Sequence, residues 1–178
     1  SKLIAYGVTL TGADEQEIRF RKVESGDDLD IVLPYSLYNQ IDFKADGTGF
    51  FYTKRNRAES VLIYEHTFGN DLVNDKIIFG QGIPLENWIW IDESASGRYR
   101  VFNVSHGWSR NDLYFVDTQS EQGLVTIVEG MDGSFNTWFI GDRLFVSSDV
   151  SANNGEIYEV DWANPSFESW TTVIKQDP

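Results

Sequence analysis

The residues that could perform catalysis are few in this chain, and they stand in patterns that do not fit it. The sequence has two histidines, His66 and His106, and no cysteine. A serine nucleophile needs Gly-x-Ser-x-Gly between a strand and a helix, where a strained turn exposes the hydroxyl. The nearest string, residues 107–111 around Ser109, ends in Asn and lies between two strand-like runs. We therefore expect Ser109 to be a hairpin-loop residue and neither histidine to be a general base.

Metal and glycosidase chemistry are also poorly matched by the acidic residues. The Asp-rich stretches 27–30 and 71–75 lack the central Gly and closing Glu of a calcium loop, and we interpret them as acidic turns. Residues 46–49 resemble the aspartate box of sialidases, but Gly follows Asp directly and Phe50-Phe51 stand where Trp is required. The sequence thus predicts no catalytic residue, no cofactor and no metal site.

Composition and net charge exclude some classes of binding partner. The chain is 178 residues long, with 41% hydrophobic and 15% aromatic residues, which is enough apolar material for a packed core. A net charge of -14 repels phosphate backbones and anionic lipid, so we expect neither nucleic acid nor membrane as a partner. No signal peptide is recognisable. The expected location is cytoplasmic, or periplasmic if a signal peptide has been removed.

A repeated turn and strand in the sequence indicates where the predicted β-strands lie. The turn and aromatic strand at residues 46–52 return at 96–102 and again at 141–146, with steps of 50 and 45 residues (97 minus 47 and 142 minus 97). Such a period is typical of the four-stranded blades of a β-propeller. Between turn residues, the repeats resolve into strand-like runs at 2–6, 17–22 and 30–33; 40–43, 49–53, 61–66 and 76–79; 88–92, 99–105, 113–117 and 125–128; and 135–139, 143–147, 156–161 and 170–174.

The expected fold is therefore all-β, a partial β-propeller over residues 1–178. Four blades are predicted, at about residues 1–36, 37–82, 83–131 and 132–178, the first without its inner strand. Many runs are apolar at consecutive positions, which suits a strand covered on both faces. An up-and-down barrel or a two-sheet sandwich is the alternative fold, although neither requires a recurrent period.

The motifs on these runs resemble the propeller of the prolyl oligopeptidase family, and they follow its order along nearly the whole chain. The matching segments are residues 45–52, 63–69, 96–99, 105–114, 141–146, and 160–165 continuing through Trp170 to 173–174. The resemblance implies part of a seven-bladed propeller that belongs to a serine endopeptidase cleaving short peptides after proline. In that family the catalytic triad lies in an α/β-hydrolase domain, which this chain lacks.

Two functions follow. The first is a noncatalytic substrate-gating propeller domain, or a fragment of one, whose partners are a hydrolase domain and short peptides. The alternative is a freestanding propeller module that binds a peptide or protein on one face. A reading frame continuing into Gly-x-Ser-x-Gly would favour the first. The chain ends suggest a piece of a longer protein, and the open faces of a partial ring predict self-association, with a homo-oligomer as one outcome.

Three aromatic residues are the candidate substrate-binding positions. Tyr38 and Trp88 each lie nine residues before the Gly of their repeat's turn (47 minus 38 and 97 minus 88), so we expect them to enter inner strands at equivalent heights. By resemblance, these two positions and Trp108 match sites that line the substrate pocket beyond the proline subsite. Packing between blades is the alternative role for each ring.

Overall fold

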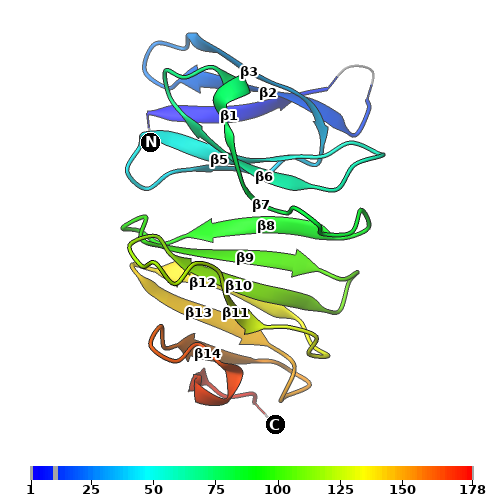
Figure 1. The fold of residues 1–178 in the computed structure, drawn as a ribbon, viewed down its shortest axis with the longest axis vertical. Coiled ribbons are helices and arrows are strands. Elements are labelled where there is room, and N and C mark those ends of the chain that lie inside the picture. The colour runs from blue at the N-terminus through cyan, green and yellow to red at the C-terminus, as the bar shows by residue number, and fades with distance from the viewer. Residues whose placement is uncertain (1, 10–11, 178) are drawn as a thin grey trace. The chain divides into compact units, whose positions relative to one another are not determined.

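The computed structural model describes residues 2–9 and 12–177, and it is built from four antiparallel sheets (Figure 1). Sheet A has the order β1-β2-β3, and sheets B, C and D have four strands each in the orders β4-β5-β6-β7, β8-β9-β10-β11 and β12-β13-β14-β15. Within each sheet the strands follow one another in sequence. In the described residues the only helical segments are two short 3-10 turns, η1 (Leu72–Asn74) and η2 (Phe167–Ser169). The all-β prediction is confirmed.

The strands lie where the turn signals placed them. The bounds are β1 Leu3–Val8, β2 Glu15–Lys22, β3 Asp28–Leu37, β4 Ile41–Phe43, β5 Gly49–Lys54, β6 Leu62–Thr67, β7 Lys76–Phe79, β8 Trp88–Glu93, β9 Tyr99–Ser105, β10 Asn111–Asp117, β11 Val125–Val128, β12 Phe135–Ile140, β13 Arg143–Ser148, β14 Glu156–Val160 and β15 Thr171–Ile174. Sheet A has the predicted three strands. β3 extends beyond the expected run at both ends, and its first residue, Asp28, is held by Arg21 of β2 through an ion pair of 2.7 Å.

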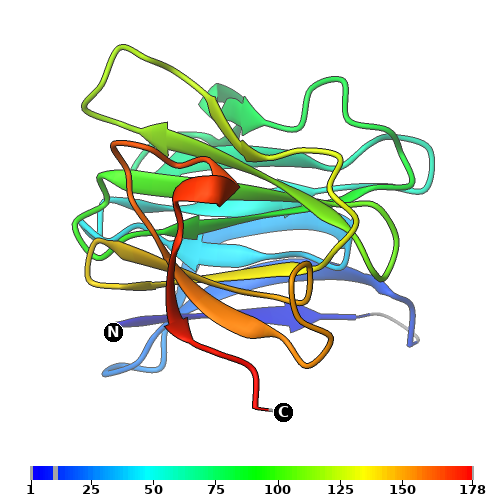
Figure 2. The same ribbon diagram turned by 90° about the horizontal axis from the view of Figure 1, so that it is seen from below.

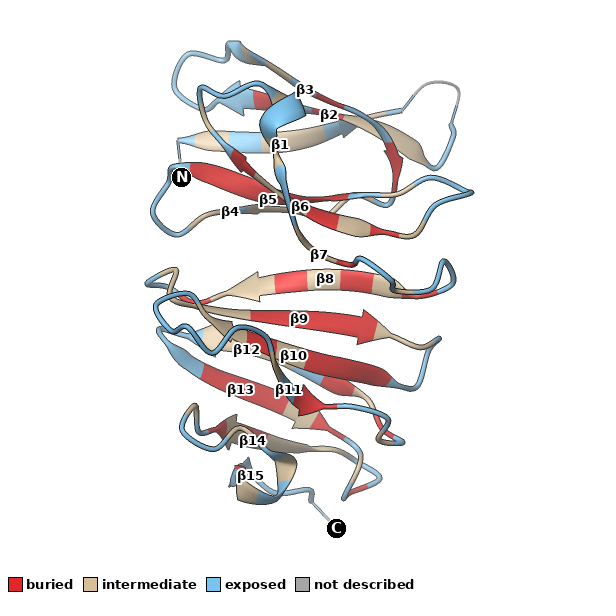
Figure 3. Ribbon diagram, viewed as in Figure 1, coloured by how far each residue is buried: buried red, intermediate tan, exposed pale blue. Residues whose placement is uncertain are grey.

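The chain forms two compact units. Unit 1 comprises residues 1–42 and 49–85, and unit 2 comprises residues 43–48 and 86–178. Figure 3 shows buried residues running along β9, β10 and β13 of unit 2. The middle strands are buried at consecutive positions, as in Phe50 to Thr53 of β5, so both faces of these strands are covered.

The core of unit 1 joins sheets A and B through aromatic rings. Phe20 of β2 stacks on Phe50 of β5 with ring centroids 4.5 Å apart, and both side chains are fully buried. Tyr52 and Tyr64 stack beside this pair at 5.2 Å. Offset stacking of this kind adds to the free energy gained by burying apolar area.

The core of unit 2 depends on a tryptophan that follows β14. The ring of Trp162 stacks on Phe115 at 4.4 Å and on Tyr99 at 4.7 Å, both from sheet C, and lies 5.9 Å from Phe139 of sheet D. Its indole N–H donates to the carbonyl of Asp142 at 2.9 Å. Figure 2 shows the segment that returns from β14 through η2 to β15. Trp162 thus fastens sheet C to sheet D.

A buried amide makes the second connection between these two sheets. Asn111 opens β10, is 5% exposed, and bonds the backbone of Phe135 in β12 from both sides of its amide. Its Nδ2 donates to the Phe135 carbonyl at 2.8 Å, and its Oδ1 accepts from the Phe135 N–H at 2.8 Å. The Asn111 side chain therefore makes the pair of hydrogen bonds that a neighbouring strand would make with Phe135, although β10 and β12 belong to different sheets.

A third connection joins the first strands of sheets C and D. Asp92 of β8 accepts hydrogen bonds from Thr137 of β12 at 2.5 Å and from Asn103 of β9 at 3.4 Å. Burial raises the pKa of the Asp92 carboxyl, and the two hydrogen bonds oppose that shift. Both bonds are accepted by Oδ2 of Asp92 and come from neutral donors, so this cluster positions β8 against β12.

Unit 1 contains a comparable polar triad. The carboxylate of Asp75 lies 2.9 Å from the hydroxyl of Tyr52 and 2.8 Å from Nδ1 of His66. The side chains of His66 and Asp75 are almost wholly buried. Nε2 of His66 is buried without a hydrogen-bond partner in the described residues. Burial raises the pKa of the Tyr52 hydroxyl, and its bond to Asp75 raises it further.

Candidate functional site

Trp88 and Trp108 lie at the same end of sheet C. Trp88 is the first residue of β8 and pairs with Ser105, the last residue of β9. Ser105 in turn pairs with Asn111, so the loop of residues 106–110 that carries Trp108 leaves the sheet at the level of Trp88. The topology of one sheet therefore brings two of the three sequence-predicted positions together.

Trp108 projects from a hairpin loop that is closed by internal hydrogen bonds. The indole is fully exposed. The N–H of His106 donates to the carbonyl of Arg110 at 2.8 Å, and the hydroxyl of Ser105 donates to the carbonyl of Gly107 at 2.6 Å. Gly107 has a φ of 85°, a left-handed conformation that a residue with a Cβ adopts only at a cost. The loop thus presents one large aromatic ring to solvent.

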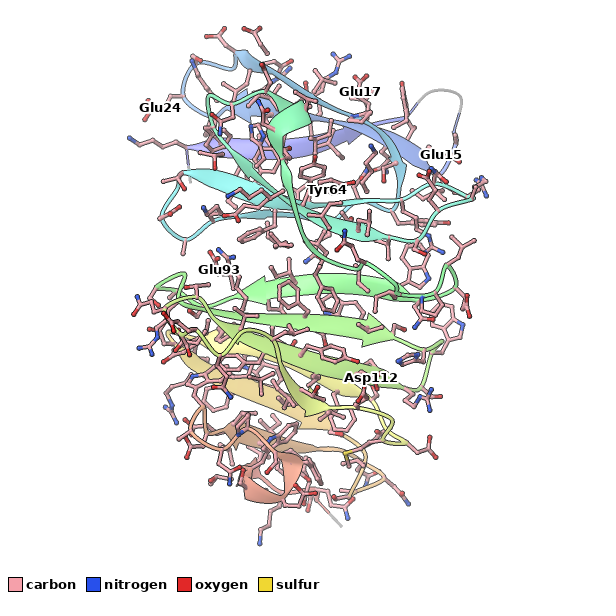
Figure 4. All side chains as sticks on the ribbon, viewed as in Figure 1. Glu15, Glu17, Glu24, Tyr64, Glu93 and Asp112 are labelled. Carbon is pink, nitrogen blue, oxygen red and sulfur yellow. The ribbon has the colours of Figure 1, made fainter. Side chains whose placement is uncertain are left out.

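His106 holds the base of this loop. Its Nδ1 lies 2.9 Å from the amide nitrogen of Asn87, and its Nε2 lies 2.5 Å from Oδ2 of Asp112. The other oxygen of Asp112 accepts the N–H of Gly130 at 2.8 Å. Figure 4 labels Asp112, which lies on β10 beside the hairpin loop. Both ring nitrogens of His106 therefore have side-chain partners within the fold.

Tyr38 is exposed and has an unusual backbone. It is 56% exposed and has a φ of 47°, the only positive φ among the non-glycine residues that the structure describes. The residues on either side hold it there: the N–H of Leu37 donates to the carbonyl of Arg55, and the N–H of Gln40 donates to the hydroxyl of Thr53. Residues held in strained conformations concentrate at functional positions.

The expected equivalence of Tyr38 and Trp88 is wrong in one respect. Trp88 begins β8, whereas Tyr38 lies before β4, which begins at Ile41. The left-handed turn at Tyr38 interrupts the extended backbone between β3 and β4, and its neighbours Leu37 and Gln40 are both bonded to the carboxyl-terminal end of β5, at Arg55 and Thr53. Tyr38 belongs to unit 1 and the two tryptophans belong to unit 2. That the three rings share one face stays a prediction.

The strain at Tyr38 can be relieved by a residue that tolerates the left-handed region. We expect Tyr38→Asn to raise the free energy of unfolding of the chain by about 1 kcal/mol, because Asn adopts this conformation at low cost. Urea titration followed by far-UV circular dichroism measures the change. Tyr35→Asn is the control, since Tyr35 is an exposed residue inside β3 and has no positive φ. A Tyr38→Asn chain no more stable than wild type would contradict the assignment of strain.

The remaining candidates from the sequence have structural positions. Ser109 is exposed in the loop between β9 and β10, as predicted. His66 is wholly buried in the triad with Asp75 and Tyr52. The part of the chain that the structure describes contains no group of three or more His, Cys, Asp or Glu side chains arranged to hold a metal ion. It also contains no helix long and apolar enough to span a membrane.

Grooves occur away from the three aromatic positions. One of about 760 Å³ lies in unit 1, between the outer strand β3 and the segment from Phe68 to Leu72. Another, of about 450 Å³, lies beside Trp162 and the Arg143–Glu159 ion pair in unit 2. The candidate site is thus the half-buried Trp88 and the exposed Trp108 at one end of sheet C, and it would need a facing surface to enclose a ligand.

Comparison with known proteins identifies a close match in architecture. The family model described as the N-terminal β-propeller domain of prolyl oligopeptidase matches residues 1–177. A structure from a mechanistic study of two prolyl endopeptidases is similar with a TM-score of 0.88 and 24% identity, covering 99% of this chain and 27% of that chain. Prolyl oligopeptidase B from Galerina marginata, bound to a 35mer substrate, is similar with a TM-score of 0.81 and 17% identity, covering 99% and 27%. The chain therefore spans about a quarter of the length of these relatives.

Proposed function

Because the chain belongs to the family of prolyl oligopeptidase N-terminal β-propeller domains, we propose that it is a noncatalytic domain that selects the peptides reaching a hydrolase active site. In prolyl oligopeptidases this propeller is paired with a catalytic hydrolase domain. The family membership confirms the resemblance and the propeller fold. The proposed selection of peptides is argued from the aromatic residues of the candidate site.

The observation that carries the proposal is the exposed Trp108 beside Trp88. A fully exposed indole on a hydrogen-bonded loop gains little from folding, because its apolar surface stays in water. Such a ring can bury an apolar side chain of a peptide while losing few rotamers, since tryptophan has only two side-chain torsions. The loop end of sheet C would then contact a side chain on the amino-terminal side of a substrate proline, beyond the residue that directly precedes it.

Size selection follows from the same arrangement. A short extended peptide can place one side chain against Trp108 and still enter a narrow opening, whereas a folded protein presents its side chains on a rigid surface. The propeller would add affinity for short peptides without taking part in bond cleavage, so its residues affect which peptide is cut and leave the chemistry to the hydrolase.

The proposal can be tested by peptide affinity. We expect the 178-residue chain to bind Ac-Phe-Gly-Pro-NH2, and Trp108→Ala to weaken this binding about fivefold, which is the effect of losing one aromatic contact. Replacing the Phe of the peptide by Ser should cause a similar loss in wild type and none in Trp108→Ala. Isothermal titration calorimetry measures both affinities.

Tyr35→Ala is the matched control, because it removes an exposed ring elsewhere on the chain. The proposal fails if the wild-type chain binds the Phe and Ser peptides equally, or if Trp108→Ala leaves the difference between them intact. Binding of a folded protein in place of short peptides would favour a freestanding binding module.

A further inference from the structure

The hydrogen bonds of His106 connect the two tryptophans of the candidate site. Asn87 directly precedes Trp88, and His106 stands two residues before Trp108. The 2.9 Å contact between the Asn87 amide and His106 Nδ1 therefore joins the chain segments that present both rings. We propose that His106 is a positioning residue that fixes the Trp108 loop in the conformation that contacts peptide. This inference rests on the proposed function.

The donors and acceptors fit a neutral imidazole. With the Asn87 amide donating to Nδ1, the ring carries its proton on Nε2 and donates it to Asp112. Asp112 is nearly buried and accepts from two sides, from His106 and from the N–H of Gly130. Nδ1 can only accept from Asn87 and Nε2 can only donate to Asp112, so the two contacts allow a single orientation of the ring.

The connection draws on four parts of sheet C. Asn87 precedes β8, His106 follows β9, Asp112 lies in β10, and Gly130 follows β11. A loop held only at its two strand ends can rotate about them. A loop whose first residue is also bonded to Asn87 before β8, and to Asp112, which itself binds Gly130 after β11, has lost that freedom when the chain folds.

The physical benefit is preorganisation. Binding to a mobile loop pays the entropy of ordering the loop at the moment of binding, which subtracts from affinity. Here that cost is met during folding by two side-chain hydrogen bonds and the backbone bond from His106 to Arg110. The contribution of Trp108 to peptide affinity should therefore depend on His106, although His106 need not touch the peptide.

Two substitutions separate hydrogen bonding from packing. His106→Gln keeps one donor for Asp112 and one acceptor for Asn87, while His106→Phe keeps a planar ring and removes both bonds. Hydrogen–deuterium exchange of the hairpin at residues 105–112 reports the order of the loop without any peptide. Affinity for Ac-Phe-Gly-Pro-NH2 reports its effect on binding. Asp117→Ala is the control, since it removes the ion pair with Arg98 at the other end of the same strand, β10.

We expect His106→Phe to accelerate exchange in the hairpin about tenfold and to weaken peptide binding about fivefold, because the loop loses two hydrogen bonds. In that background, Trp108→Ala should weaken binding no further. His106→Gln should stay within about twofold of wild type in both measurements. Asp117→Ala should change neither. If His106→Phe does not fold, Asn87→Ala tests the same connection and should move exchange and affinity in the same direction.

Unchanged hairpin exchange in His106→Phe would overturn the inference, and so would a Gln variant as loose as the Phe variant. A wild-type chain that binds no peptide would instead count against the proposed function. The exchange comparison needs no peptide, so it still decides whether His106 positions the loop.

Discussion

Replacing Asn111 by alanine should lower the free energy of unfolding of unit 2 by about 3 to 5 kcal/mol, because it leaves the N–H and the carbonyl of Phe135 without partners in a buried place. Phe135 is 1% exposed, so water cannot replace the lost bonds. All six tryptophans of the chain lie at or beyond residue 88, within unit 2. Urea titration followed by tryptophan fluorescence therefore reports the unfolding of this unit.

Two further variants test the reason for the loss. Asn111→Asp has almost the same shape and keeps an acceptor for the Phe135 N–H, but it sets a carboxylate oxygen against the Phe135 carbonyl. We expect it to be nearly as destabilising as alanine, since the defect is electrostatic. Asn136→Ala changes an exposed asparagine of β12, next to Phe135, and should cost less than about 0.5 kcal/mol. Equal stabilities of the Asn111 and Asn136 variants would contradict the pairing role.

Raising the pH from 10 to 12 should remove about 2 to 3 kcal/mol of the stability of unit 1 through Tyr52 alone. The pKa of its hydroxyl is raised in the fold, first by burial and then by the bond to Asp75. The unfolded chain releases this proton near pH 10, whereas the folded chain retains it. The contribution of Tyr52 is therefore fully present below pH 10 and is lost as the pH rises above it.

Tyr52→Phe isolates this effect from the other groups that titrate in alkali. At neutral pH the variant should be less stable by about 1.5 kcal/mol, because Asp75 loses one of its two buried partners. Its stability should fall less steeply above pH 10, so the two curves should cross about one pH unit higher. Urea titrations followed by far-UV circular dichroism at a series of pH values give both curves. Parallel curves above pH 10 would show that Tyr52 ionises equally in both states.

The strands could be predicted because their signals are local. The bounds of β7, β9 and β11 agree with the predicted runs to the residue, since each is an apolar run between turn residues. The early strands were predicted too short. Polar residues such as Glu15 and Asp28 begin β2 and β3, and tertiary ion pairs with Arg57 and Arg21 keep them extended. A contact between residues 42 positions apart, as for Glu15 and Arg57, leaves no periodic mark in the sequence.

The site was only partly predictable for the same reason. The positions of Tyr38, Trp88 and Trp108 came from the motifs, but the left-handed backbone of Tyr38 has no sequence signal, since Gly or Asn would be the usual residue there. The role of His106 was missed. Asp112 lies six residues after it across a hairpin, so the β9 to β10 register could have indicated the pair, whereas the contact with Asn87 needs the sheet.

The stack of Trp162 on sheet C has a consequence for synthesis of the chain. Trp162 lies 47 residues after Phe115, one of the two rings of sheet C that it covers (162 minus 115). A ribosome adding about 5 to 20 residues per second needs roughly 2 to 10 s to make that stretch. During this time Tyr99 and Phe115 lack the ring that covers them in the fold. Sheet C is thus a segment of the nascent chain that needs protection from aggregation until the end of sheet D arrives.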